Sequence, residues 1–367
     1  MEKAGQQDRE AGKPIAIHSL ACKTYKYSSA FLIMMHKTLS ADLHTHAIEK
    51  DTKASEYWKR VLEIGLNAVA ITEHAEHNPK EAYERIAAEK PEGVLLIPGI
   101  ELKTNIGHVI AYCESARIYE IPELLEIDLP IERAIEIANE RGLLLSIAHP
   151  WGFSHDSAAY LIGRKKLEQI VERNYIGVET YDGMIGSLYR YVMESGWIKK
   201  PLKFFSFLER NRVARRVVIG KLGAIMRKKI DAKSSELVNR CVAPIELGEK
   251  AAFITAGSDA HSADRIGCGM MWIKVADEAL TNEGMLEALR KKGNVIWAGP
   301  LMKELKSNIY EFAVEPLHRK EILQGLKYAT KSVVEKHKIK EKIAKRIGRR
   351  ALKEKAGKIK RKLLRRN

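Results

Sequence analysis

The chain has 367 residues, of which 45% are hydrophobic and 30% are charged, and its formal net charge is +16. This length can bury one large domain and leave residues for an appendage. The longest early apolar run, AFLIMM at residues 30–35, is far shorter than the roughly 18 residues that cross a bilayer. It is also too short for a signal-peptide core, so we expect neither a transmembrane helix nor a secretory leader.

Cysteine usage points to a reducing compartment. The four cysteines are Cys22, Cys113, Cys241 and Cys268, and no two are close in sequence. Such spacing argues against a disulfide framework and against a thiolate zinc site. We therefore expect a cytoplasmic protein.

Residues 1–37 lack any regular pattern and precede the first predicted strand. We interpret them as an N-terminal extension, either a disordered one or the product of a misassigned start codon. Met34 or Met35 would be a natural start immediately before the first strand.

From residue 38 to 182 the sequence alternates regularly between strand and helix patterns. Short apolar runs predict buried strands, and helical periodicity separates most of them. The predicted strands are TLSADLHTH, NAVAITEH, VLLIPGIEL, GLLLSIAHP and, later, AAFITAGSDAH; the helices include KASEYWKRVLEIGL, PKEAYERIAAEK and PIERAIEIANERG. This alternation predicts an α/β fold with a mainly parallel sheet, and in a closed barrel the functional groups collect at the carboxyl ends of the strands.

Histidine and carboxylate side chains follow these strands. The candidate metal ligands are His44, His46, Asp51, His74, Glu101, His108, His149, Asp259 and His261. Imidazole and carboxylate ligands suit zinc, manganese or iron, and nine groups are too many for one tetrahedral ion. We therefore predict a cluster of two or three divalent cations.

Strand geometry makes some of these residues pairs. Side chains alternate along a strand, so His44 and His46 point to the same side, as do Asp259 and His261. By the same alternation His74 and Glu73 cannot both face the cluster, and we assign His74 as the ligand. Glu101 is a carboxylate able to bridge two cations.

Two basic residues follow strands that carry predicted metal ligands by only a few positions. Lys103 and Arg265 could contact the phosphate of a substrate through fixed positive charge, although an ordinary solvated role is an equal alternative.

The regular alternation stops between about residues 183 and 242. This segment is rich in aromatic, basic and apolar residues and predicts a mostly helical insertion on the same face as the ligands. Tyr189, Phe204, Phe205 and Phe207 interleave with Lys and Arg, a pattern able to stack bases, but aromatics at helical spacing also form the core of such an insertion. NVIWAG at residues 294–299 is the last predicted strand of a barrel that covers residues 38–300.

Residues 301–367 are predicted to form a basic helical tail. From Lys327 onward there are 18 Lys or Arg and three acidic residues, so this tail carries +15 of the net charge. Nucleic acid or an anionic membrane surface is the expected partner, and a solvated tail with no partner is the alternative.

The motifs DLHTH, ITEH, GIEL with GHV, AHP and GSDAH, in this order, resemble those of the polymerase and histidinol phosphatase (PHP) family of metal-dependent phosphoesterases. The resemblance covers residues 38–300 apart from the insertion. It implies a distorted seven-stranded TIM-like barrel, two or three metal ions, and a ligand role for the nine residues above. GVETYDG around Glu179 is similar to another family feature beside the site, whereas many relatives have Asp where this chain has Glu73.

The expected activity is hydrolysis of a phosphate ester by a metal-bound hydroxide, with no protein nucleophile. A nucleotide or a nucleic-acid end is the expected substrate, because a basic tail would raise its local concentration. Two alternatives stay open: a small-molecule phosphatase of the histidinol-phosphatase type, and a non-catalytic protein that binds nucleic acid or a membrane surface through its tail. The sequence does not indicate the oligomeric state.

Overall fold

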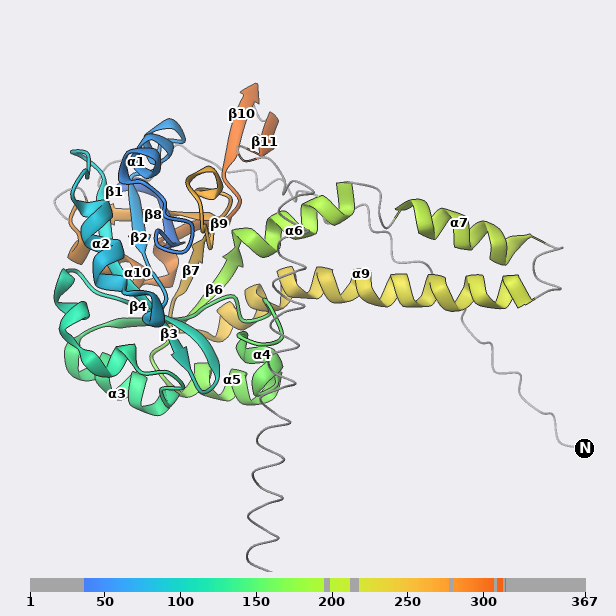
Figure 1. Ribbon diagram of the computed structural model, residues 1–367, viewed down its shortest axis with the longest axis horizontal. Helices are drawn as coiled ribbons and strands as arrows, with labels where there is room; N and C mark the ends of the chain where they lie inside the picture. Colours follow the sequence, from blue (N-terminus) through green and yellow to red (C-terminus); the bar gives the residue numbers. More distant parts are fainter. Residues whose placement is uncertain are drawn as a thin grey trace, which may run out of the picture. The chain divides into compact units, whose positions relative to one another are not determined.

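A computed structural model of the protein describes residues 36–194, 199–211, 218–276, 280–306, 309–312 and 314 (Figure 1). The N-terminal extension before residue 36 and the basic tail from Lys327 lie outside the described residues. The predictions made for both segments therefore stay predictions.

One mixed sheet dominates the described residues. Its strands are β1 (His36–Thr45), β2 (Ala68–Ile71), β3 (Leu95–Thr104), β4 (Gly107–Tyr112), β5 (Leu144–Ile147), β6 (Gly177–Asp182), β7 (Ile254–Gly257), β8 (Met270–Ala276) and β9 (Val295–Gly299). They lie in the order β7-β6-β5-β4-β3-β2-β1-β8-β9. The pairs β1/β2, β2/β3, β5/β6 and β6/β7 are parallel, whereas β4 is antiparallel to both β3 and β5.

The sheet curls into a nearly closed barrel. Thr45, the last residue of β1, forms a parallel bridge with Ala260 just beyond the end of β7, and the His46 N–H donates to the Ala260 carbonyl oxygen at 2.8 Å. The predicted TIM-like barrel is thus confirmed, but the strand count of seven is wrong, since this sheet has nine strands. The difference includes β8, which pairs antiparallel with β9 and follows β7 with only a short 3₁₀ turn between them, so strand-helix alternation gave no signal for it.

Helices connect most of the consecutive strands (Figure 1). They are α1 (Ala54–Glu63), α2 (Pro79–Ala87), α3 (Ile131–Arg141), α4 (Ala158–Leu161), α5 (Arg164–Arg173) and α10 (Asn282–Leu289), with 3₁₀ helices η2 (Ala75–His77), η3 (Ala116–Glu120), η4 (Pro122–Leu125), η5 (Ala263–Arg265) and η7 (Lys292–Asn294). In α3 the buried residues Ile131, Ala134 and Ile137 recur every three positions, and Gly142 ends the helix at a φ of 71°.

The core explains why the strands are apolar on both faces. Inside the barrel, Leu43, Ile97, Tyr112 and Phe253 are fully buried, while other apolar residues of the same strands pack under the surrounding helices. Strands covered on both faces read as mainly apolar runs, and the few polar residues inside them, such as Asp42 and Ser146, are buried.

The predicted insertion is helical. It contains α6 (Gly183–Glu194), α7 (Lys199–Arg210) and α9 (Val218–Lys250), so the last helix continues beyond the predicted boundary at residue 242. The carboxyl-terminal part of α9 packs against β6, where Ala243 and Leu247 are buried. The insertion is therefore anchored beside the carboxyl end of β6.

The start of the predicted helical tail is a correction. Residues after β9 form the antiparallel pair β10 (Met302–Lys306) and β11 (Ile309–Phe312) rather than a helix. Arg190 of α6 stacks over the Phe312 ring at 3.7 Å and donates to the Val314 carbonyl oxygen, so this pair is held by the insertion. Among the described helices, none has the length and apolar content of a membrane span.

Candidate metal centre

Glu101 of β3 lies at the centre of a buried histidine cluster. Its Oε2 lies 2.8 Å from His74 Nδ1, 3.5 Å from His46 Nε2 and 3.6 Å from His44 Nε2. Its Oε1 lies 2.8 Å from His108 Nδ1 and 2.9 Å from His149 Nε2. The two oxygens thus face two different groups of histidines, which is the arrangement a bridging carboxylate needs.

Asp259 and His261 approach the same cluster from the segment after β7. Asp259 Oδ1 lies 3.2 Å from His46 Nε2 and 3.6 Å from His44 Nε2. The His261 ring stacks on the His46 ring with 4.4 Å between centroids. Residues more than two hundred positions apart therefore meet at one end of the barrel, as the strand pattern predicts.

Several buried polar atoms of this cluster lack hydrogen bonds. Among the described side chains, His44 Nε2, His46 Nε2 and Glu101 Oε2 are buried with no hydrogen-bond partner. Buried polar groups are normally paired, and an unpaired one costs about 1–3 kcal/mol. Three such atoms that converge in one buried cluster fit a site able to hold cations.

The local groupings also fit metal coordination. Ligand atoms lie within 4.8 Å of one another in three overlapping sets drawn from the predicted ligands: His44 with His46 and Asp259, His46 with His74 and His261, and His74 with Glu101 and His108. These residues could hold more than one ion, because each set offers nitrogen and in two cases oxygen ligands.

A second layer of carboxylates fixes the imidazoles. Glu179 Oε1 lies 3.0 Å from His44 Nδ1, and its Oε2 accepts the backbone N–H of His149 at 2.7 Å. Glu73 Oε2 accepts the N–H groups of Ala47 and Ile48, and its Oε1 lies 3.4 Å from His46 Nδ1. Ligating histidines usually have such an acceptor on the other ring nitrogen, which turns the free nitrogen toward the metal.

Charge pairing shows in the pKa values. Burial alone would lower the pKa of His46, but the neighbouring carboxylates of Asp259, Glu73 and Glu101 outweigh it and raise the pKa to about 10. Burial would raise the pKa of Glu101, yet His108, His74 and His44 hold it well below its usual range. A cation that binds here would displace protons from the imidazoles.

Strained backbone marks the ends of two ligand strands. His149 has a φ of 25° and Asp259 a φ of 52°, both in a region that non-glycine residues rarely adopt. Such conformations cost about 1–3 kcal/mol and cluster at functional sites.

The structure does not bring Asp51, one of the predicted ligands, into the cluster. Its side chain is 87% exposed and forms a 2.7 Å ion pair with Arg85, and it belongs to no ligand grouping among the described residues. Glu49, a residue that the sequence pattern does not single out, lies beside the cluster instead, with its Oε2 3.2 Å from His261 Nε2. Its Oε1 lies 3.5 Å from His77 Nδ1 and 3.8 Å from His74 Nε2.

The two predicted phosphate contacts differ in position. Lys103 lies opposite His108 in the β3/β4 ladder, is partly exposed, and pairs with Glu76 at 3.0 Å. Arg265 is buried, with its Nε 3.6 Å from Asp264, so it offers no solvent-facing cation. Lys103 is the more exposed of the two, and its contact with a substrate phosphate stays a prediction.

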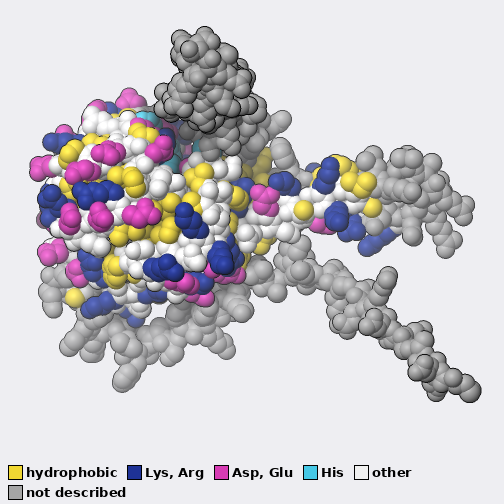
Figure 2. Space-filling model, turned by 90° about the horizontal axis from the view of Figure 1, so that it is seen from below, with side chains coloured by type: hydrophobic (Ala, Val, Ile, Leu, Met, Phe, Trp, Pro, Cys, Tyr) yellow, Lys and Arg dark blue, Asp and Glu magenta, His cyan; other side chains and the backbone are white. Residues whose placement is uncertain are grey.

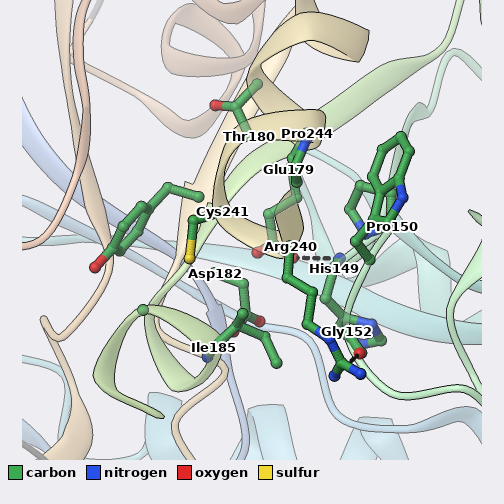
Figure 3. Close-up of a pocket in the computed structure, with 13 residues that line it drawn as sticks. His149, Pro150, Gly152, Glu179, Thr180, Asp182, Ile185, Arg240, Cys241 and Pro244 are labelled. Atoms are coloured by element: carbon green, nitrogen blue, oxygen red, sulfur yellow. Dashed lines mark hydrogen bonds between the residues drawn. The ribbon is translucent and has the colours of Figure 1, made fainter. Parts of the chain in front are cut away.

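A pocket lies beside the cluster and shares His149 and Glu179 with it (Figure 3). Its walls come from the loop after β5, from β6, and from α6 and α9 of the insertion; they include Trp151, Asp182, Ile185, Arg240, Cys241 and Pro244. Arg240 donates to the Gly152 carbonyl oxygen at 2.8 Å and so ties α9 to the loop that carries His149. Burial raises the pKa of the Cys241 thiol to about 11, which argues against a thiolate nucleophile here.

The fold and this site define a mixed α/β barrel with a cluster of histidine and carboxylate side chains able to bind divalent metal ions. A family model described as PHP-associated matches residues 252–293, the segment that contains Asp259 and His261. This match agrees with the resemblance of the ordered strand-end motifs to the PHP family.

Two solved structures are also similar. One is a two-domain protein containing a predicted PHP-like metal-dependent phosphoesterase from Bacteroides vulgatus, with 16% identity, a TM-score of 0.41, and coverage of 71% of this chain and 64% of that chain. The other is PsfC from Pseudomonas syringae, with 14% identity, a TM-score of 0.44, and coverage of 80% of this chain and 99% of that chain. The chain thus spans less than two thirds of the first of these proteins. Among curated proteins none matches.

Proposed function

We propose that this protein is a metal-dependent phosphoesterase that uses two or three divalent cations, and that its substrate is a nucleotide or a nucleic-acid end. The observation that carries the proposal is Glu101, whose two carboxylate oxygens face separate groups of histidines. A carboxylate so placed holds neighbouring cations at the spacing that phosphoester hydrolysis uses.

The protein's own residues supply binding and orientation. His44, His46 and Asp259 form one donor group, and His108 and His149 form another on the far oxygen of Glu101. When bound, the cations supply Lewis acidity and lower the pKa of water. Glu179 and Glu73 keep the Nδ1 protons of His44 and His46, which leaves their Nε2 atoms as ligands.

The pocket beside the cluster is narrow, but it marks the side on which the organic part of the ester would lie. Because it shares His149 and Glu179 with the cluster, a phosphate held by the cations would direct its substituent toward Trp151 and Arg240. Two of its walls belong to the insertion, so the insertion would select the substrate. The nucleotide assignment is supported by the +15 charge of the tail, which would concentrate a polyanion.

Hydrolysis of an aryl phosphate, a bis-aryl phosphate and a short oligonucleotide tests the proposal. Activity should require Mn²⁺, Zn²⁺ or Fe²⁺ and should fall by at least about a hundredfold in His44→Ala and Asp259→Ala. Glu84→Ala, a change on the exposed face of α2, is the matched control and should keep full activity. Full activity in both cluster variants would refute the metal assignment. Hydrolysis of the aryl phosphate alone would refute the nucleic-acid substrate and favour a small-molecule phosphatase.

A further inference from the structure

The insertion helix α7 has a face that combines phenylalanine with positive charge. Phe204 and Phe207 are 57% and 61% exposed. Lys200, Lys203 and Arg210 are exposed as well. At 100° per residue these five positions fall within about one third of the helix circumference, which we call the outer face of α7.

The outer face is not the core of the insertion. Phe205 and Leu208 lie outside this third of the circumference and are half-buried, and α7 packs against α9. The need to bury apolar surface within the insertion therefore explains Phe205 and Leu208 but not Phe204 and Phe207. Two exposed phenylalanines three positions apart form a continuous apolar stripe.

The neighbouring helix continues this character. On α9, Ile225 is 53% exposed, and Lys228 and Lys229 close to it are also exposed. Figure 2 shows hydrophobic and basic side chains close together on the described part of the arm that α7 and α9 form. The segment 218–230 contains no acidic residue.

This composition selects the kind of partner. A helix with phenylalanine and leucine on one side and lysine or arginine around them lies in the headgroup region of a membrane, where apolar side chains enter the acyl boundary and cations meet anionic lipid. Stacking on nucleic-acid bases would explain the phenylalanines but not the aliphatic Ile225, which has no ring to stack. The acyl boundary of a membrane accommodates Phe204, Phe207 and Ile225 alike.

We propose that the arm of α7 and α9 docks onto an anionic phospholipid surface, with Phe204 and Phe207 inserted at the level of the headgroups and Lys200, Lys203 and Arg210 on the phosphates. This inference is independent of the catalytic proposal, because none of these residues belongs to the metal centre or to the pocket beside it.

Vesicle flotation of the full chain tests the docking. The probes are vesicles of phosphatidylcholine alone and of phosphatidylcholine mixed with phosphatidylglycerol. The wild-type protein should float with the mixed vesicles, and Phe204→Ser combined with Phe207→Ser should weaken that binding by about tenfold or more. Leu62→Ser on α1, where the side chain is 56% exposed, is the matched control and should bind as the wild type does.

Measuring how deeply the side chain at position 207 enters the bilayer distinguishes binding by the arm from binding by the tail. The basic tail is present in every variant, so its attraction for anionic lipid is the same in all of them. In Phe207→Trp, the added fluorescence should be quenched by lipids brominated on the acyl chains, relative to the wild type with its own five tryptophans. Circular dichroism of each variant confirms that the fold is kept.

Three results would overturn the proposal. Undiminished flotation of the double serine variant would assign binding to the tail alone. If brominated lipid left the added fluorescence of Phe207→Trp unchanged, insertion of the outer face would be excluded. Loss of single-stranded oligonucleotide binding in the double serine variant, with vesicle binding intact, would make the phenylalanines a base-stacking surface instead.

Discussion

Glu179 of β6 and His44 of β1 are joined by a buried contact of 3.0 Å between Oε1 and Nδ1. The second oxygen of Glu179 accepts the backbone N–H of His149, so one carboxylate orients two members of the cluster. Both side chains are buried: His44 is 0% exposed and Glu179 is 1% exposed. The Nε2 of His44 can therefore face a cation only in the ring orientation that Glu179 fixes.

Replacing Glu179 should weaken metal binding while leaving the fold intact. Glu179→Gln keeps the shape but removes the charge that stabilises the His44 ring, and we expect a 10–100-fold loss of Mn²⁺ or Zn²⁺ affinity. Titration calorimetry on chelator-treated protein measures this loss. Glu172→Gln on the exposed end of α5 is the control. Unchanged affinity in Glu179→Gln would show that His44 is oriented by something else.

The loop after β1 offers a test between two carboxylates. Spacing alone favours Asp51 as a ligand, but the structure turns it outward to Arg85 and brings Glu49 to His261. Glu49→Gln should therefore lower metal affinity or activity by about tenfold or more, whereas Asp51→Asn should leave both nearly unchanged. Metal content by mass spectrometry and aryl phosphate hydrolysis measure the two effects. The reverse ranking would restore Asp51 to the ligand set.

Whether the sequence predicts the position of a site residue depends on whether that position follows from the local strand pattern or from a contact with a distant residue. The meeting of these side chains could be predicted because each lies at or just beyond the carboxyl end of a strand, and these ends collect at one rim of a barrel; they are His44, His46, Glu101, Asp259 and His261. Alternation along each strand then fixes which side chains share a side.

Asp51 could not be assigned correctly in this way, because it lies in a turn at a φ of 49° and its direction depends on Arg85, which is 34 positions away. Strand β8 was missed for a similar reason: an antiparallel partner, β9, defines it, and no helix precedes it to announce a crossover. The pocket beside the cluster could not be predicted from the sequence either, because it depends on the contact between Arg240 of α9 and Gly152.

Stability should depend on pH in opposite ways with and without metal. In protein stripped of cations, the pKa of His46 is about 10 when folded and roughly 6.5 when unfolded, so the unfolded chain binds fewer protons between these values. The stabilisation from protonated His46 is complete below about pH 6.5 and is lost as the pH rises toward 10. The melting temperature of stripped protein should fall over this window.

Metal-loaded protein should not follow that course, because bound cations require unprotonated imidazoles and gain affinity as the pH rises. Differential scanning calorimetry of both forms from pH 6 to 10 tests the contrast. His46→Gln, stripped in the same way, should show a shallower fall. An identical slope in stripped wild type and in His46→Gln would place the linked protons on other groups.

Gly257 at the end of β7 is in close contact with His44, and this contact gives a stability prediction. A Cβ added at Gly257 would overlap both the backbone nitrogen and the Cβ of His44, and in a parallel barrel neither strand can move aside without disturbing its neighbours. Gly257→Ala should therefore cost about 1–3 kcal/mol in the free energy of unfolding and also displace His44 from the cluster.

Gly293→Ala is the matched control, because nothing lies within 4 Å of its added Cβ. Urea unfolding measures the first effect and metal titration the second. A variant at Gly257 as stable and as competent in metal binding as the one at Gly293 would mean that β1 and β7 do not approach each other this closely, and the convergence of His44 with Asp259 would then need another explanation.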